Sequence, residues 1–157
     1  MTHDNGPRAI LVTGGARSGK SRFAEKLAEN SGLQKVYVAT GAAHDSEMEK
    51  RILLHRDRRG DNWQTTEEPL DLEPVLRREC RPDRIVLVDC LTLWLSNLML
   101  AERDIDAATE ELIAALQGAE APVALVSNEV GTGIIPANPL ARRFADAQGI
   151  LNQKIAA

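Results

Sequence analysis

The sequence predicts an α/β fold in three layers with a mainly parallel sheet. Short, nearly continuous apolar runs rich in β-branched residues alternate with longer segments of helical spacing. Such runs suit strands that are buried on both faces, and their alternation with helices implies a parallel sheet covered by helices. We expect strands at residues 9–13, 36–39, 85–88 and 123–126, and helices at residues 21–30, 46–58, 91–101, 106–116 and 140–155.

Length and composition favour one globular unit. The chain has 157 residues, so we expect residues 1–157 to form a single domain. The net charge of −4 gives no electrostatic reason to bind nucleic acid or an anionic membrane. No apolar run approaches the roughly 20 residues that span a bilayer, and residues 1–8 are polar, so we expect a cytoplasmic protein. Cys80 and Cys90 are then expected to be reduced thiols.

A phosphate-binding motif directly follows the first expected strand. The motif has the pattern G-x-x-x-x-G-K-[ST] and consists of Gly14, Gly15, Ala16, Arg17, Ser18, Gly19, Lys20 and Ser21. Glycines let the backbone wrap around an anion, at the N-terminus of a helix whose dipole favours negative charge. Lys20 would reach the β- and γ-phosphates, and the Ser21 hydroxyl would bind Mg²⁺. The motif predicts a P-loop NTPase fold, RecA-like, whereas the alternative is a glycine turn that only connects strand to helix.

A second candidate is Asp89, which ends the apolar run at residues 85–88. A strand of this kind delivers a carboxylate to the edge of the sheet where ligands bind, which is the Walker B position, so Asp89 could hold Mg²⁺. An aspartate at this point could also cap the following helix. Both roles remain open from the sequence.

A histidine lies on a basic helix between the two halves of the chain. Ser46 and Glu49 form a capping box for this helix, and His55 lies at the border between its apolar and basic stripes. An imidazole beside guanidinium groups could attack a nucleotide phosphate whose charge the arginines neutralise. On spacing alone, a half-buried histidine on a solvated helix is the simpler interpretation.

The whole pattern resembles the cobinamide kinase / guanylyltransferase family of cobalamin biosynthesis. The resemblance rests on the phosphate loop together with the segments at residues 37–41, 47–56, 63–67, 89–97 and 128–136. It implies phosphorylation of adenosylcobinamide by a nucleoside triphosphate, GTP or ATP, and transfer of GMP from GTP to adenosylcobinamide phosphate. It also implies a covalent histidine–GMP intermediate on His55, Lys20 as the second catalytic residue, Mg²⁺ as cofactor, and a homotrimer.

The resemblance further implies which residues touch the nucleotide. Besides the phosphate loop they are Ala39, Thr40, Gly41, Arg56, Asp57, Arg58, Arg59, Glu67 and Asp89. Each has a simpler interpretation: a helix-entry turn at residues 39–41, a solvated basic face at residues 56–59, and a surface charge at Glu67. The family usually continues past its final helix into another strand, so we expect this strand to be missing here.

Two other functions fit the phosphate loop. One is a plain P-loop kinase of small molecules in which His55 is structural. The other is a GTP-binding switch, although the chain has no Asn-Lys-x-Asp element of the kind that reads guanine.

Overall fold

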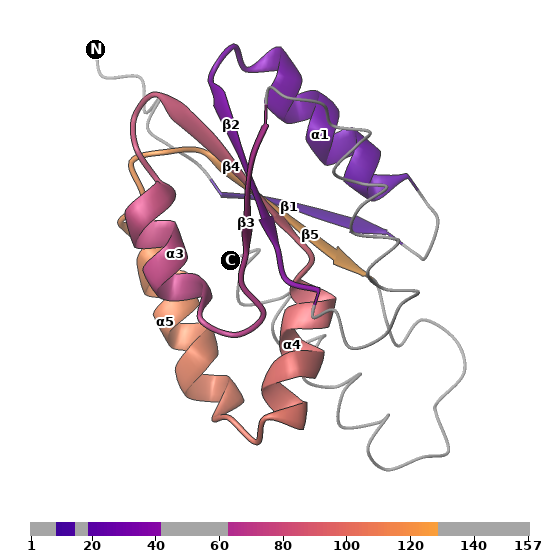
Figure 1. Cartoon of the computed structure of the whole chain (residues 1–157), viewed down its shortest axis with the longest axis vertical. Helices are drawn as coiled ribbons and strands as arrows, with labels where there is room; N and C mark the ends of the chain where they lie inside the picture. The colour runs from indigo at the N-terminus through magenta and orange to yellow at the C-terminus, as the bar shows by residue number, and fades with distance from the viewer. Residues whose placement is uncertain (1–8, 15–18, 42–62, 129–157) are drawn as a thin grey trace.

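Five parallel strands form the centre of the molecule in a computed structural model that describes residues 9–14, 19–41 and 63–128 (Figure 1). The strands are β1 (Ala9–Gly14), β2 (Gln34–Ala39), β3 (Trp63–Glu67), β4 (Arg84–Asp89) and β5 (Val123–Asn128). Their order across the sheet is β1-β5-β4-β2-β3, and all four neighbouring pairs are parallel. The strand that carries the start of the phosphate motif is therefore separated by β5 from the strand that carries Asp89.

Helices cover both faces of this sheet. They are α1 (Lys20–Asn30), α3 (Leu72–Glu79), α4 (Leu91–Leu100) and α5 (Ile105–Gln117). Figure 1 shows α1 on one face and the other three helices on the opposite face. The predicted three-layer α/β fold with a mainly parallel sheet is confirmed, and each predicted strand or helix that lies within the described residues is found within two residues of its predicted bounds.

Side chains that alternate between the two faces of the central strands contribute to two separate hydrophobic cores. In β4, Val86 and Val88 pack with α3, α4 and α5, whereas Ile85 and Leu87 lie in the cluster that includes Ala24 of α1. Because successive side chains of a strand point to opposite faces, a strand covered on both sides must be apolar at every position. This explains the continuous apolar runs of the sequence.

Two elements were not predicted from the sequence, β3 and α3. Strand β3 has the polar sequence WQTTE because it pairs only with β2 at the edge of the described sheet, so part of it faces solvent. Helix α3 contains Pro74, which its first turn tolerates because N–H groups there have no partner within the helix. The spacing of Leu72, Val75 and Leu76, which are all buried, is the signal from which this helix could have been predicted.

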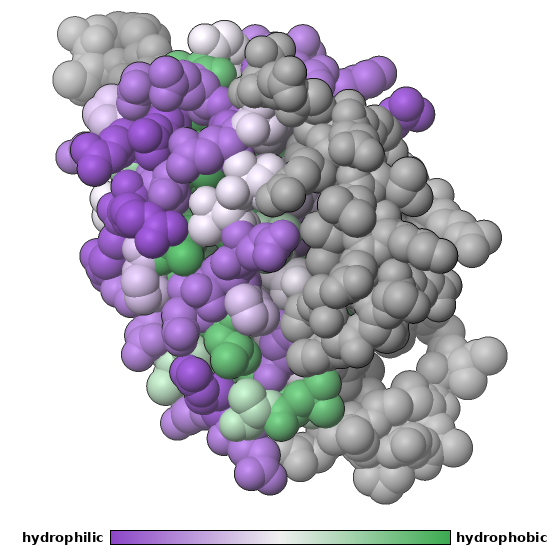
Figure 2. Space-filling view, viewed as in Figure 1, coloured by the Kyte–Doolittle hydropathy of each residue, from purple (hydrophilic) through white to green (hydrophobic). Residues whose placement is uncertain are grey.

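The described surface is largely hydrophilic. Figure 2 shows charged and polar side chains over most of it on this face, with small separate hydrophobic patches. None of the helices within the described residues is long and apolar enough to cross a membrane. The helices predicted at residues 46–58 and 140–155, and any strand beyond the latter, lie outside the described residues.

Candidate nucleotide-binding and catalytic site

The carboxyl ends of all five strands meet at one edge of the sheet. The registers pair Gly14 with Asn128, Ala39 with Asp89, and Ala39 with Glu67. Four of the residues predicted from separate sequence motifs, Gly14, Ala39, Glu67 and Asp89, thus lie along this one edge. Ligands of parallel α/β proteins bind at this edge, so the topology brings the predicted site residues together.

The described part of the phosphate loop has the geometry of an anion site. Gly19 has φ of 81°, in the left-handed region that a side chain disfavours, and α1 begins at the next residue. The first turn of α1 holds Lys20 and Ser21, both half-buried, and contains no acidic residue. The positive end of the helix dipole is therefore not neutralised within that turn, which favours binding of a phosphate.

Asp89 lies at the end of β4, on the face of the sheet that α1 covers. Its neighbour two residues earlier, Leu87, packs in the core cluster beneath α1, and alternate residues of a strand share a face. The carboxylate Oδ2 accepts a hydrogen bond of 2.6 Å from the hydroxyl of Tyr37. The residue that caps α4 is Cys90, whose Sγ accepts from the backbone N–H of Leu93, so Asp89 does not serve as that cap.

Electrostatics link the start of α1 to the end of β4. Burial and, to a smaller extent, the charge of Asp89 raise the pKa of the Cys90 thiol to about 11, against the opposing effects of backbone hydrogen bonds from Leu93 and Thr92 and of the Lys20 ammonium. Lys20 is therefore close enough to act on the residue that follows Asp89. Lys20 begins the helix that covers this face of the sheet, and Asp89 ends a strand on the same face. An ammonium and a carboxylate near one sheet edge are groups that binding of a metal-bound triphosphate requires.

Thr40 holds the ends of β2 and β4 together. The side chain is fully buried, and its hydroxyl lies 2.6 Å from the carbonyl oxygen and 2.8 Å from the backbone nitrogen of Cys90. The backbone N–H of Thr40 donates to the carbonyl of Asp89, and its carbonyl accepts from the side-chain amide of Asn97. These contacts favour a supporting role for the Thr40 side chain, beneath the residues that face a ligand.

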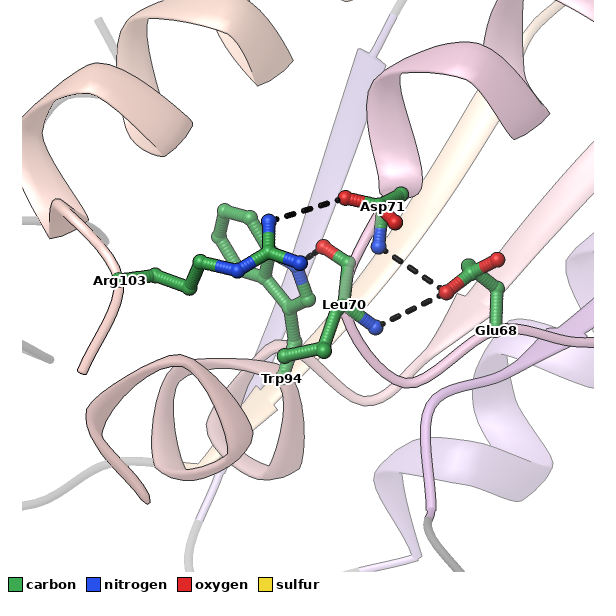
Figure 3. Close-up of polar contacts among 5 residues, drawn as sticks. All are labelled: Glu68, Leu70, Asp71, Trp94 and Arg103. Carbon is green, nitrogen blue, oxygen red and sulfur yellow. Dashed lines mark hydrogen bonds and ion pairs between the residues drawn. The ribbon is translucent and has the colours of Figure 1, made fainter. Parts of the chain in front are cut away.

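The loop after β3 is fixed beside this edge by polar contacts (Figure 3). The carboxylate of Glu68 accepts from the backbone N–H groups of Leu70 and Asp71, and the indole of Trp94 donates to the carbonyl of Leu70 at 2.7 Å. Arg103 completes the set with an ion pair to Asp71 at 3.3 Å. Glu67, the predicted site residue that precedes this loop, is exposed at the sheet edge.

The structure describes part of the predicted site. The described members are Gly14, Gly19, Lys20, Ser21, Ala39, Thr40, Gly41, Glu67 and Asp89. The remaining members lie outside the described residues, and they are Gly15, Ala16, Arg17, Ser18, His55, Arg56, Asp57, Arg58 and Arg59.

Sequence reasoning missed two supporting residues, Tyr37 and Asn97. Tyr37 lies two positions before Ala39 in β2 and so faces the same side of the sheet as Asp89. Asn97 lies in the middle of the apolar helix α4, where a polar side chain is unusual. Both could have been found as polar groups within otherwise apolar segments that lead to the site edge.

A parallel α/β sheet with a phosphate loop after β1 and a carboxylate at the end of β4, the next strand but one, defines a P-loop nucleotide-binding protein. Residues 10–157 match the family described as cobinamide kinase / cobinamide phosphate guanyltransferase. The chain belongs to this family, in agreement with the resemblance of its motifs.

Characterised relatives span nearly the whole chain. The bifunctional adenosylcobalamin biosynthesis protein CobP of Pseudomonas aeruginosa is 50% identical over 93% of this chain and 86% of its own length. The CobU proteins of Escherichia coli and Salmonella typhimurium are 42% and 44% identical, each over 94% of this chain and 90% of their own length. Among solved structures, the RadB recombinase matches with a TM-score of 0.48 and 17% identity, over 88% of this chain and 72% of that chain.

Proposed function

We propose that this chain phosphorylates adenosylcobinamide with a nucleoside triphosphate and then transfers GMP from GTP to adenosylcobinamide phosphate. The observation that carries this proposal is the family match over residues 10–157, whose description names both activities. The relatives with 42–50% identity are named as bifunctional proteins of adenosylcobalamin biosynthesis. The phosphate loop and Asp89 at one sheet edge support the same conclusion from the geometry.

In the proposed kinase step, the aminopropanol hydroxyl of adenosylcobinamide attacks the γ-phosphorus, and the bond from this phosphorus to the β,γ-bridging oxygen breaks. The hydroxyl proton is released, and the nucleoside diphosphate leaves. Lys20 and the N–H groups at the start of α1 neutralise the negative charge that moves onto the leaving diphosphate. The half-buried position of Lys20 supports this role, because attraction between charges is stronger where water is partly excluded.

The residues at the edge fit a magnesium ion. Within the described ranges no group of three or more His, Cys, Asp or Glu side chains could hold a metal by itself. Mg²⁺ needs no such group, since it is usually bound by one or two protein oxygens, by phosphate oxygens and by water. Asp89 and Ser21 offer a carboxylate and a hydroxyl of this kind, and the bound ion would neutralise charge on the triphosphate.

In the proposed guanylyl step, a neutral imidazole nitrogen of His55 attacks the α-phosphorus of GTP, and pyrophosphate leaves. An oxygen of adenosylcobinamide phosphate then attacks the same phosphorus, and the phosphorus–nitrogen bond breaks. The attacking nitrogen must carry no proton, so only the neutral ring can attack, and the proton on the other ring nitrogen is released once the phosphorus–nitrogen bond has formed. The basic residues at positions 56, 58 and 59 would favour the neutral ring over the imidazolium by repulsion. They would also neutralise the phosphates of the bound nucleotide.

The guanylyl step can be tested with labelled nucleotide. The protein is incubated with Mg²⁺ and GTP carrying label at the α-phosphate, and the label on the protein is tested for acid lability and alkali stability. We expect label on the wild type and none on His55→Ala, which should still bind GTP. Failure to label the wild type while nucleotide binding is intact would remove His55 as nucleophile and favour the plain kinase.

The kinase step needs its own assay, because it does not use the imidazole. Adenosylcobinamide is supplied with γ-labelled ATP or GTP, and label transfer to the corrinoid is measured. We expect His55→Ala to retain this transfer and Lys20→Ala to lose it. Loss of transfer in both variants would contradict separate roles for the two residues.

Three further predictions belong to the same proposal. The resemblance predicts a homotrimer. The polar start of the chain and the lack of a membrane-spanning apolar run predict a cytoplasmic location, and we expect no nucleic-acid or membrane partner. The net charge of −4 supports the last of these, because both partners are anionic. Light scattering of the purified protein checks the oligomeric state directly.

A further inference from the structure

The hydroxyl of Tyr37 forms a hydrogen bond to the carboxylate of Asp89. Tyr37 lies on β2 opposite Leu87 of β4, and Asp89 lies two residues further along the same face. The tyrosine side chain is therefore aligned along the sheet toward the site edge, and its hydroxyl donates to Oδ2 of Asp89 at 2.6 Å. This distance is typical of a hydrogen bond from a hydroxyl to an ionised carboxylate.

The ring of Tyr37 is fixed from the other side by Trp63. The two rings meet edge to face, with centroids 6.1 Å apart and planes at 80°. Only 4% of Tyr37 and 8% of Trp63 is exposed, and the ammonium of Lys35 lies 5.9 Å from the centroid of the indole ring. A ring enclosed in this way cannot swing its hydroxyl away from Asp89 without disturbing the core beneath α1.

We propose that Tyr37 is a positioning residue for Asp89, and that it fixes the carboxylate so that the aspartate can hold Mg²⁺ on the bound nucleotide. The inference rests on the proposed metal-binding role of Asp89. The hydroxyl donates to Oδ2 and thereby fixes the rotation of the carboxylate group. The direction of Oδ1, the other carboxylate oxygen, is fixed by the same hydrogen bond. Groups that orient a metal ligand commonly change metal affinity by about 10- to 100-fold when they are removed.

A purely structural role for the same contact makes a different prediction. A buried tyrosine hydroxyl needs a hydrogen-bond partner, and Asp89 could be that partner without any consequence for the ligand. In that case, loss of the hydroxyl would lower stability and leave the effect of Mg²⁺ on nucleotide binding unchanged. In the positioning role, the effect of Mg²⁺ falls while binding of the metal-free nucleotide is retained.

The test measures the coupling between metal and nucleotide. The dissociation constant of the α,β-methylene analogue of GTP, which resists transfer of its α-phosphate, is measured in EDTA and in saturating Mg²⁺. The ratio of the two constants is the coupling factor, and it reports the metal site without any turnover. The variants are Tyr37→Phe, which keeps the ring and loses the hydroxyl, and Asp89→Asn.

We expect Tyr37→Phe to lower the coupling factor about tenfold, with the constant in EDTA within about twofold of the wild type. Asp89→Asn should lower the factor at least as far, and adding Tyr37→Phe to it should cause no further loss. A fall of less than about threefold in Tyr37→Phe, with coupling lost in Asp89→Asn, would overturn the inference and leave the proposed function intact. Coupling retained in Asp89→Asn would remove the metal role of Asp89 and the inference with it.

A matched control separates loss of a buried hydroxyl from loss of this particular hydroxyl. Thr109 is buried in α5, in the layer on the opposite face of the sheet, and its hydroxyl donates to the carbonyl of Ile105 at 2.7 Å. Thr109→Val should leave the coupling factor unchanged, and circular dichroism should show native secondary structure in all variants. A fall in coupling in Thr109→Val equal to that in Tyr37→Phe would show that the effect is general destabilisation, which overturns the inference.

Discussion

Replacing Asn97 with alanine should destabilise the site edge more than any exposed substitution. The side-chain amide donates to the carbonyl of Thr40 at 2.7 Å and to the carbonyl of Pro69 at 3.0 Å, so it joins the end of β2 to the loop that precedes α3. Each hydrogen bond contributes about 1 kcal/mol net, and a buried carbonyl left without a donor costs more. Thr40 is fully buried, so water cannot readily replace the amide there.

We therefore expect Asn97→Ala to lower the free energy of unfolding by about 2–3 kcal/mol, measured by urea denaturation followed by circular dichroism. The thermal midpoint should fall by about 5–10 °C for a chain of this size. Ser96→Ala, at the adjacent half-buried position of α4, should change stability by less than about 0.5 kcal/mol.

The variant Asn97→Asp tests the direction of the hydrogen bonds. An ionised carboxylate has no donor for the two carbonyl oxygens, so this variant should be at least as unstable as Asn97→Ala at pH 8. It should recover part of its stability at pH 5, because repulsion in the folded state raises the pKa of the introduced carboxyl and a protonated acid can donate once. A loss below about 0.5 kcal/mol in Asn97→Ala, or no pH dependence in Asn97→Asp, would refute this reasoning.

Three further predictions concern buried polar groups. Burial raises the pKa of both Cys80 and Cys90 from 9.0 to about 11, so the folded state keeps these thiols protonated at a pH where the unfolded chain releases the protons. The stability that is present below pH 9 is therefore lost as pH rises toward 11. The urea midpoint should fall over this window, and it should fall less steeply in the Cys80→Ala and Cys90→Ala variants. The same burial should make Cys90 alkylate at pH 8 far more slowly in the folded protein than in urea, as mass spectrometry of iodoacetamide-treated samples would show. Glu79 forms an ion pair with Arg84 at 2.8 Å, and only 6% of the glutamate side chain and 23% of the arginine side chain is exposed. Glu79→Ala should therefore lower the free energy of unfolding in urea by about 1–3 kcal/mol, less than for a fully buried pair because the arginine is partly exposed. A loss equal to that of an exposed glutamate variant would contradict this prediction.

The main elements of the fold could be predicted because their signal is local. Strand β4 is covered on both faces at its four central positions, and the apolar side chain at each of them, from Ile85 to Val88, is visible in the sequence itself. The two elements that were missed carry weaker local signals. Strand β3 is polar because it lies at an edge of the described sheet. Helix α3 has only eight residues, and a proline and two arginines interrupt its apolar pattern.

The candidate site could be predicted in part for the same reason. The phosphate motif and the strand ending in Asp89 are contiguous in the sequence, so their chemistry can be read from one segment at a time. The contacts of Tyr37 and Thr40 could not be read in this way. Their partners are 52 and 50 residues distant along the chain, and no local pattern specifies which strand becomes the neighbour of which.

The sequence by itself determined the fold class, the phosphate loop, the carboxylate at the end of β4, and the family to which the chain belongs. The tertiary structure alone decided the strand order β1-β5-β4-β2-β3, which makes β2 and β4 neighbours and brings the hydroxyl of Tyr37 to Asp89. It also decided that the Thr40 side chain is buried beneath the edge. The physical reason is that residue types record local chemistry and burial, whereas the pairing of strands depends on how all the apolar faces of the chain are buried together.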